Sequence, residues 1–194
     1  HPLLMTRGVP GTHDVKLGLE IINSLRNADK NTVTMIPRFN KAIDDVYPKS
    51  EWTKFVGKPD VVLIDGWCID ATAQEDSELI TPVNELEATE DKDCVWRRYV
   101  NDQLKTTYKD LFDTINFLVM LQIPSYDKVF EWRNLQEEKL RIKNQGKEAT
   151  HIMTPDQVRR FIAHYERITR HILAEMPERA DMLFKVNDNH RLYI

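Results

Sequence analysis

Polar side chains that could bind an anion are concentrated in the segment RGVPGTHD, residues 7–14. Two glycines and a proline shape this loop, which supplies the arginine, hydroxyl, imidazole and carboxylate of Arg7, Thr12, His13 and Asp14. Apolar residues recur at spacings of three and four directly afterwards, so a helix is predicted to begin there with Asp14 as its N-cap. Helix N-termini favour anions, and arginine offers a bidentate fork for carboxylate or phosphate. The residues alone leave two possibilities open, an acid-binding loop and a structural turn.

A second pair of cations follows a short β-branched segment, residues 32–36, which predicts a strand. Arg38 and Lys41 lie three residues apart at the exit of that strand, where they would suit an anionic substrate or a phosphate. The alternative is that they pair with Asp44 and Asp45 in a solvated loop, as exposed charges commonly do.

Asp65 follows the continuous apolar run VVLI, residues 61–64. Such a run predicts a strand buried on both faces, and hence a parallel sheet. Ligands of open parallel sheets bind beyond the carboxyl ends of the strands. A carboxylate at that position can hold Mg²⁺ directly or through water. The alternative is that Asp65 only caps the turn that follows.

A fourth cationic group lies in residues 131–141, which are predicted to be helical. Arg133 and Arg141 could face one way and close over phosphate oxygens. The alternative is a solvated helix in which Glu137 and Glu138 pair with these arginines at i,i+4 or i,i+3 spacing. The six histidines include no i,i+4 pair and none lies near a cysteine, so no zinc site is predicted.

These candidate residues lie on or between predicted strands and helices that alternate along the chain. Such alternation predicts an α/β fold with a mostly parallel sheet. A capping box, Thr154 with Gln157 around Pro155, marks the start of a helix with a wide apolar stripe. We expect one domain over residues 1–194 with a lid-like helical segment near 125–150. The predicted strands are 32–36, 61–64, 115–123 and 182–186, and the predicted helices begin at residues 14, 93, 125 and 154.

Composition excludes several classes of function. The chain is 41% hydrophobic and 30% charged with a net charge of -4, so a generic binder of nucleic acid or of an anionic membrane is not expected. A weaker nucleic-acid hypothesis would use the arginines between residues 159 and 170. The longest apolar stretch, residues 115–123, is too short to cross a bilayer. Cys68 and Cys94 indicate reduced thiols of a cytoplasmic protein, with a disulfide as the minor alternative.

Taken together, five segments resemble the glycerate kinase-like family of P-loop kinases, which is similar to the D-glycerate 3-kinases and related to the uridine kinase and phosphoribulokinase group. The resemblance covers nearly the whole chain and follows the same order. It implies a P-loop kinase sheet with helices on both faces, and phosphoryl transfer from ATP, with Mg²⁺, to a small hydroxy acid such as glycerate. The matching segments are RGVPGTHD (7–14), IPRFNKAIDD (36–45), WTKFVGKPDVVLIDGWCID (52–70), IPSYDKVFEWRNLQEEKLR (123–141) and MTPDQVRRFIAHYERIT (153–169).

The resemblance also implies roles for the candidate residues. Asp65 would support Mg²⁺ near the attacking hydroxyl, and it stands where several relatives carry Glu, so the shorter side chain favours contact through water. Arg133 and Arg141 would belong to the lid. The predicted substrate-binding residues are Arg7, Thr12, His13, Asp14, Arg38 and Lys41.

One part of the family's pattern is missing from the sequence, because no G-x-x-x-x-G-K-[ST] motif occurs in it. We expect that phosphate-binding loop, together with an Asp-Asp-Phe-Tyr segment, to lie upstream of His1, and we expect the 194-residue chain alone to be inactive. The favoured hypothesis is an ATP-dependent small-molecule kinase. Its rival is a non-catalytic binding or regulatory protein that keeps the substrate loops without binding nucleotide.

Overall fold

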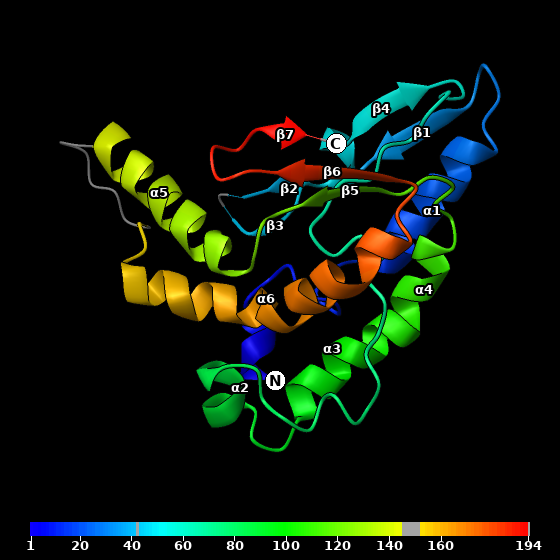
Figure 1. Ribbon diagram of the computed structural model, residues 1–194. Coiled ribbons are helices and arrows are strands. Elements are labelled where there is room, and N and C mark those ends of the chain that lie inside the picture. The colour runs from blue at the N-terminus through cyan, green and yellow to red at the C-terminus, as the bar shows by residue number, and fades with distance from the viewer. Residues whose placement is uncertain (42, 145–151, 194) are drawn as a thin grey trace. The chain divides into compact units, whose positions relative to one another are not determined.

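The computed structural model describes residues 1–41, 43–144 and 152–193, and within them the chain has an α/β architecture of helices and small sheets (Figure 1). The chain divides into two compact units. The first unit comprises residues 1–13 and 67–194, and the second comprises residues 14–66.

Within residues 14–41 and 43–66, the second unit contains one α-helix, one 3₁₀ helix and two antiparallel strand pairs. Asp14 caps the helix as predicted, since its Oδ1 accepts the backbone N–H of Leu17 at 3.0 Å. The predicted strand at 32–36 is present, but it pairs with an antiparallel strand at residues 53–56, where no strand is predicted. The elements are α1 (Val15–Arg26), β1 (Val33–Ile36), β2 (Phe39–Asn40), β3 (Asp45–Val46), the 3₁₀ helix η2 (Lys49–Glu51) and β4 (Thr53–Val56), with β1 paired to β4 and β2 to β3.

The predicted strand at residues 61–64 is wrong. This segment has no regular secondary structure, and its side chains are open, with Val61 79% and Leu63 87% exposed. β-branched residues favour an extended backbone, but a strand exists only when a neighbour completes its hydrogen-bond ladder. Among the described residues no strand pairs with this segment. Asp65 therefore does not stand at the end of a strand here.

The first unit contains a three-stranded sheet of β5 (Val119–Gln122), β6 (Met182–Val186) and β7 (Leu192–Tyr193). β5 and β6 run parallel, whereas β7 is antiparallel to β6. The last predicted strand, 182–186, is confirmed residue for residue, and the predicted strand at 115–123 shortens to β5.

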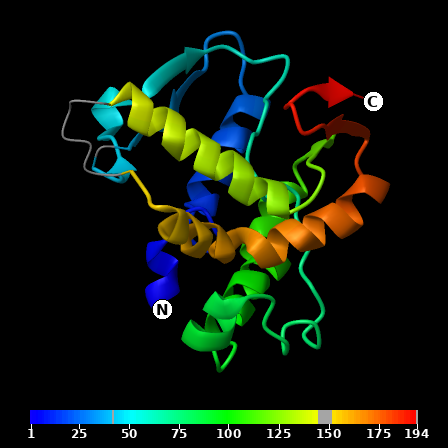
Figure 2. The same cartoon turned by 60° about the vertical axis from the view of Figure 1, so that its left-hand side comes forward.

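Helices make up most of the rest of the first unit, and Figure 2 shows α5 and α6 from a second side. The capping box at Thr154 is present, with both of its reciprocal hydrogen bonds. The helix predicted to begin at residue 93 is two helices that meet at Thr106, and the helix predicted to begin at residue 125 begins after Tyr126. The elements are η1 (Pro2–Met5), α2 (Glu85–Glu90), α3 (Val95–Lys105), α4 (Thr107–Phe112), α5 (Asp127–Lys143), α6 (Pro155–Glu175) and η3 (Met176–Glu178).

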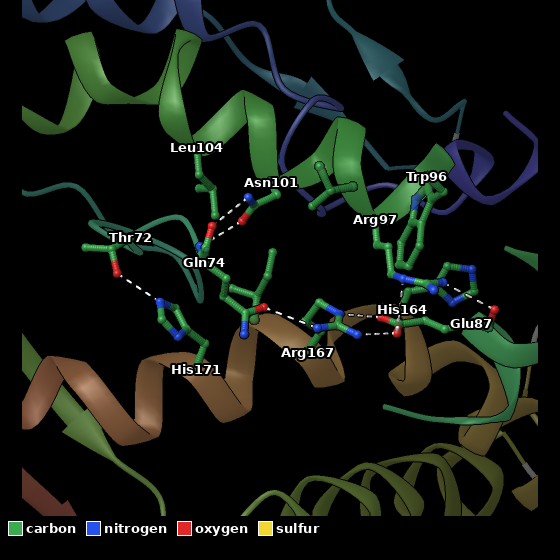
Figure 3. A pocket seen from close by; sticks show the side chains of 12 residues that line it. Thr72, Gln74, Glu87, Trp96, Arg97, Asn101, Leu104, His164, Arg167 and His171 are labelled. Carbon is green, nitrogen blue, oxygen red and sulfur yellow. Dashed lines mark hydrogen bonds and ion pairs between the residues drawn. The ribbon is translucent and has the colours of Figure 1, made fainter. Parts of the chain in front are cut away.

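A buried ionic cluster joins α2, α3 and α6 (Figure 3). Glu87 is only 1% exposed, and its two carboxylate oxygens accept hydrogen bonds from the Arg167 guanidinium at 2.8 and 2.6 Å. Arg97 forms a salt bridge with Asp91 at 3.0 Å. Both guanidinium groups also donate to backbone carbonyls of the connecting segment that precedes α2. Removing one partner of such a pair typically costs about 3–5 kcal/mol, because an unpaired charge is left buried. The cluster therefore fixes the three helices against one another.

Candidate functional site

The loop at residues 7–13 is held together first by its own hydrogen bonds. The Gly8 N–H donates to Oγ1 of Thr12 at 2.9 Å, and the Thr12 hydroxyl donates to the carbonyl of Val9 at 2.7 Å. Gly8 and Gly11 have φ angles of +108° and +94°, values that other residues adopt only at a cost. The Thr12 hydroxyl, which was predicted to bind substrate, is used inside the loop.

Aromatic side chains from distant parts of the first unit then anchor the loop's carbonyl groups. The Tyr165 hydroxyl, from α6, donates to the carbonyl of Arg7 at 2.7 Å, and the Trp67 indole N–H donates to the carbonyl of Gly8 at 2.7 Å. The two rings meet edge to face with their centroids 5.1 Å apart. Burial raises the pKa of Tyr165, so its hydroxyl stays protonated as a donor at neutral pH. The backbone on both sides of the Arg7 side chain is thereby fixed.

Tyr108, from α4, anchors the other end of the loop. Its hydroxyl oxygen accepts the N–H of Gly11 at 3.0 Å and lies 2.6 Å from Nδ1 of His13. Burial raises the pKa of Tyr108 to about 12, and burial also lowers the pKa of His13, which favours the neutral imidazole at neutral pH. The His13 side chain as a whole remains exposed, so the loop can present it to a ligand.

Arg133 on α5 lies within electrostatic reach of this loop. Its positive charge acts to lower the pKa of Tyr165, the residue that holds the carbonyl of Arg7, although burial of the phenol outweighs this effect. The guanidinium lies over the ring of Phe161 at 5.6 Å and pairs with Glu137 at 2.6 Å. Its Nε is buried without a hydrogen-bond partner among the described residues. The structure thus brings one predicted lid cation close to the loop that carries Arg7.

Arg141, the other predicted lid cation, pairs with Glu138 on the same helix. The alternative that these arginines pair with glutamates of their own helix is therefore confirmed for Arg141. Arg133 also makes such a pair, with Glu137, but it has a second contact with the ring of Phe161. Part of the segment predicted as a lid, residues 145–151, lies outside the described residues.

The remaining candidates belong to the second unit. Arg38 stacks over the Tyr47 ring at 5.1 Å and donates to the carbonyl of Glu51 at 3.5 Å, while Lys41 is exposed in the turn that follows β2. Asp65 is exposed in the irregular segment described above. The positions of Arg38 and Lys41 after β1 are as predicted, whereas the predicted strand before Asp65 is absent.

Other predicted features concern metals, membranes and nucleic acids. Within residues 1–41, 43–144 and 152–193, no three His, Cys, Asp or Glu side chains group as metal ligands, and no helix is long and apolar enough to cross a membrane. Cys68 and Cys94 are both free thiols. The arginines on α6 that favoured the weaker nucleic-acid hypothesis are paired with carboxylates, namely Arg159 with Asp156, Arg160 with Glu90, Arg167 with Glu87 and Arg170 with Glu166.

Sequence reasoning missed the anchors Trp67, Tyr108 and Tyr165 as parts of the site. Tyr108 and Tyr165 fall on the apolar stripes of predicted helices and were therefore assigned to the core. The available signal was chemical, because a buried phenol or indole needs a hydrogen-bond partner at its polar end. Here that partner is the backbone or the imidazole of the loop.

Comparison with curated proteins identifies kinases as relatives of this chain, whereas no family model matches it. The chain is 27% identical to the chloroplastic D-glycerate 3-kinase of Arabidopsis thaliana over 92% of its own length and 38% of that protein's. It is 28% identical to the probable ATP-dependent kinase TDA10 of Saccharomyces cerevisiae, over 84% and 54% of the two lengths. The uncharacterized kinase mug58 of Schizosaccharomyces pombe is 26% identical, over 85% and 58%. The chain thus spans 38–58% of the length of these relatives.

Solved structures share the fold. D-glycerate 3-kinase from Cryptococcus neoformans var. grubii superimposes with a TM-score of 0.74 at 24% identity, over 100% of this chain and 70% of that one. The YGR205w protein gives a TM-score of 0.73 at 23% identity, over 100% and 67%. The homologues of this chain are D-glycerate 3-kinase and related kinases, and the chain fits the glycerate kinase-like family.

Proposed function

We propose that the protein containing this chain transfers the γ-phosphoryl group of ATP to a hydroxyl of a small hydroxy acid, with glycerate as the first candidate. The observation that supports it most is the kinase homology, which extends over 84–92% of this chain. The loop at residues 7–13 supplies the matching chemistry, since an arginine and a neutral imidazole are suited to bind a carboxylate.

The proposed substrate-binding groups of the first unit are Arg7 and His13. The bonds from Tyr165 and Trp67 fix the backbone around Arg7 before any ligand binds, which reduces the ordering cost of binding. Arg133 adds positive charge close to Tyr165 and is the stronger of the two candidates for a lid cation. Both arginines pair with a glutamate of α5, and Arg141 is the weaker candidate because it lacks the contact with Phe161 that Arg133 makes.

The proposal assigns related roles to residues of the second unit. Arg38 and Lys41 are assigned to anionic groups of the substrates, and Asp65 is assigned to catalysis as a support for Mg²⁺. Asp14 has an established structural task as the cap of α1, so its proposed contact with substrate would use the carboxylate oxygen that the cap leaves available. Thr12 is assigned to substrate only through the shape of the loop that its hydroxyl maintains.

The donor set of the described residues is compatible with Mg²⁺ only if phosphate oxygens supply most of its ligands, because no cluster of three candidate ligands occurs there. Mg²⁺ usually binds through one or two carboxylates, several waters and substrate phosphates. Asp65, as a single exposed carboxylate, suits contact through water. When bound, the ion would neutralise charge on the transferring phosphoryl group.

The finer architectural predictions belong to the same proposal. We assign the chain to one kinase domain with a mostly parallel sheet flanked by helices on both faces, of the P-loop type, in which α5 acts as a lid. The parallel pairing of β5 with β6 supports this, as does the shared fold. The free thiols of Cys68 and Cys94 support a cytoplasmic location.

The direct test measures ADP release by the full-length protein with Mg-ATP and a panel of hydroxy acids, sugars and nucleosides. We expect glycerate or a close hydroxy acid to be the best acceptor, with product confirmed by mass spectrometry. Turnover with a nucleoside but with no acid would reject the proposed substrate class. Specific acid binding without any turnover, in a protein with no phosphate-binding loop anywhere, would favour the binding-protein hypothesis instead.

A further inference from the structure

The hydroxyl of Tyr108 has an unusually complete hydrogen-bond environment. Tyr108 is 3% exposed, and its oxygen accepts the N–H of Gly11 at 3.0 Å. The hydrogen bond from Gly11 acts to lower the pKa of the phenol, although burial outweighs this effect. The remaining neighbour is Nδ1 of His13, at 2.6 Å. A phenolic hydroxyl donates one hydrogen bond as well as accepting, so the proton of this buried phenol also needs a partner.

The direction of the bond to His13 follows from this count. A backbone N–H can only donate, so the Tyr108 oxygen is the acceptor in its hydrogen bond with Gly11. The Tyr108 proton then needs an acceptor, and among the described residues Nδ1 of His13 is the one within reach. If Nδ1 instead carried a proton, the oxygen would accept from two donors, and the proton of this buried hydroxyl would have no acceptor among the described residues. The Tyr108 hydroxyl therefore donates to an unprotonated Nδ1.

We infer that Tyr108 is a positioning residue that holds His13 as the neutral tautomer with its proton on Nε2, so that the loop presents an N–H donor to the acid group of the substrate. This inference deepens the proposed function and rests on it for the identity of the ligand. Neither the family resemblance nor the apolar position of Tyr108 on its helix required such a role.

The tautomer matters because a carboxylate can only accept hydrogen bonds. An imidazole free to exchange its proton would present a lone pair at Nε2 for part of the time, and a lone pair repels a carboxylate oxygen. Burial of the ring lowers the pKa of His13, so a positive charge does not supply the donor at neutral pH. With the Tyr108 bond in place, Nε2 is always the protonated nitrogen, and it has no hydrogen-bond partner among the described residues.

Nitrogen NMR tests the tautomer without any substrate. Long-range proton–nitrogen spectra of the labelled protein distinguish a protonated from an unprotonated imidazole nitrogen, and a His13→Gln variant identifies the His13 signals. We expect an unprotonated Nδ1 and a protonated Nε2 in the wild type. A protonated Nδ1, or an imidazolium at neutral pH, would overturn the inference.

Removal of the hydroxyl provides the matched comparison. In Tyr108→Phe we expect the His13 signals to move to those of a tautomer mixture. Tyr165→Phe is the control, because it removes a phenol that binds the same loop without contacting His13, and the tautomer should remain unchanged. A Tyr108→Phe protein that folds and keeps the wild-type tautomer would show that Tyr108 only packs against the loop.

Two further variants keep the test valid if Tyr108→Phe does not fold. The Gln amide places an N–H near the position of Nε2, whereas the shorter Asn places its amide near Nδ1. We expect His13→Gln to retain acid binding and His13→Asn to weaken it about tenfold, the size of one lost hydrogen bond to a charged group. Equal affinities for the two variants would overturn the inference.

Kinetics separate this inference from the proposed function. With the best acid acceptor, Tyr108→Phe should raise the KM for the acid about twofold, the effect of an equal mixture of tautomers, and leave the KM for ATP unchanged. A wild-type protein with the predicted tautomer and no kinase activity would contradict the proposed function alone. An active kinase in which Tyr108→Phe changes the tautomer but not the KM for the acid would contradict the role of Tyr108 alone.

Discussion

The loop at residues 7–13 and the segment at residues 61–65 were both predicted to carry site residues, but the structure treats them differently. The loop has no regular secondary structure, yet hydrogen bonds from Tyr108, Tyr165 and Trp67 fix its backbone. The segment was predicted to be a buried strand, yet it is irregular and its apolar side chains are exposed.

The difference shows what each kind of structure needs. A loop can be fixed by single donors and acceptors on side chains, and the first unit supplies these from three separate places along the chain. A strand needs a continuous row of backbone partners, and no such row faces residues 61–64 within the described part of the chain. Local order at a candidate residue is therefore set by the partners available to its backbone rather than by its own propensity.

Asp65→Asn gives the largest expected effect and tests whether the open segment performs chemistry. The substitution keeps the size of the side chain and removes its charge. If Asp65 supports Mg²⁺, kcat of the full-length protein should fall by about two orders of magnitude or more, as expected for the loss of one preorganised electrostatic group. Thermal unfolding should be unchanged, because Asn serves in turns about as well as Asp. Full activity would remove Asp65 from the catalytic residues. The loop at residues 7–13 and the segment at residues 61–65 would then differ in structure only.

Gly11→Ala tests whether the loop is as closely fixed as its hydrogen bonds indicate. Gly11 has a φ of +94°, and an added Cβ would lie 2.5 Å from Cε1 of Tyr99. Backbone strain and overpacking together should lower the free energy of unfolding by about 2 kcal/mol or more, with a loss of acid binding. Urea unfolding and acid titration measure the two effects.

Gly57→Ala is the matched control for this prediction. Gly57 has a similar φ of +100°, but the nearest atom to an added Cβ is the carbonyl oxygen of Lys30 at 3.8 Å. Gly57→Ala should therefore lower the free energy of unfolding only by the strain of the backbone, about 1–2 kcal/mol. Equal losses in the two variants would mean that the aromatic packing around the loop contributes nothing.

The sequence predicted local features of this fold better than long-range ones. The Asp14 cap, the capping box at Thr154 and the strand at 182–186 depend on residues within a few positions of one another, and the structure confirms all three. The failure at residues 61–64 and the antiparallel pairing of β1 depend on which distant segments become neighbours. Periodicity within a segment carries no information about that.

The same distinction applies to the candidate site. Arg7 and His13 were found because their loop carries an unusual density of polar types. Tyr108 and Tyr165 were assigned to the core because helical spacing reports burial and does not report where a phenol hydroxyl points. The pairing of Arg141 with Glu138 was foreseen as an alternative, since i,i+3 spacing alone places the two side chains together.

Arg7→Ala tests whether the fixed loop is a binding loop or only a structural turn. The Arg7 side chain is exposed, whereas the anchoring bond from Tyr165 is made to the Arg7 carbonyl, which an alanine would retain. Loss of a charge-assisted hydrogen bond, about 1.5–3 kcal/mol, should weaken binding of the acid about tenfold or more with little change in thermal stability. Calorimetric titration beside a melting curve provides the measurement. An unfolded variant, or one with unchanged affinity, would leave the loop with a structural role.

Leu63→Ala has the smallest expected effect and tests whether residues 61–64 lack a strand partner. Leu63 is 87% exposed, so truncation in the 194-residue chain should change the free energy of unfolding by no more than about 0.5 kcal/mol. Leu79→Ala is the matched control, because Leu79 is 1% exposed and the same truncation there should cost about 2–5 kcal/mol through lost burial and a residual cavity. Urea unfolding of both variants measures the difference. If Leu63→Ala lowered the free energy of unfolding as much as Leu79→Ala, residues 61–64 would be packed in solution. The strand that their sequence predicts would then be paired with another strand.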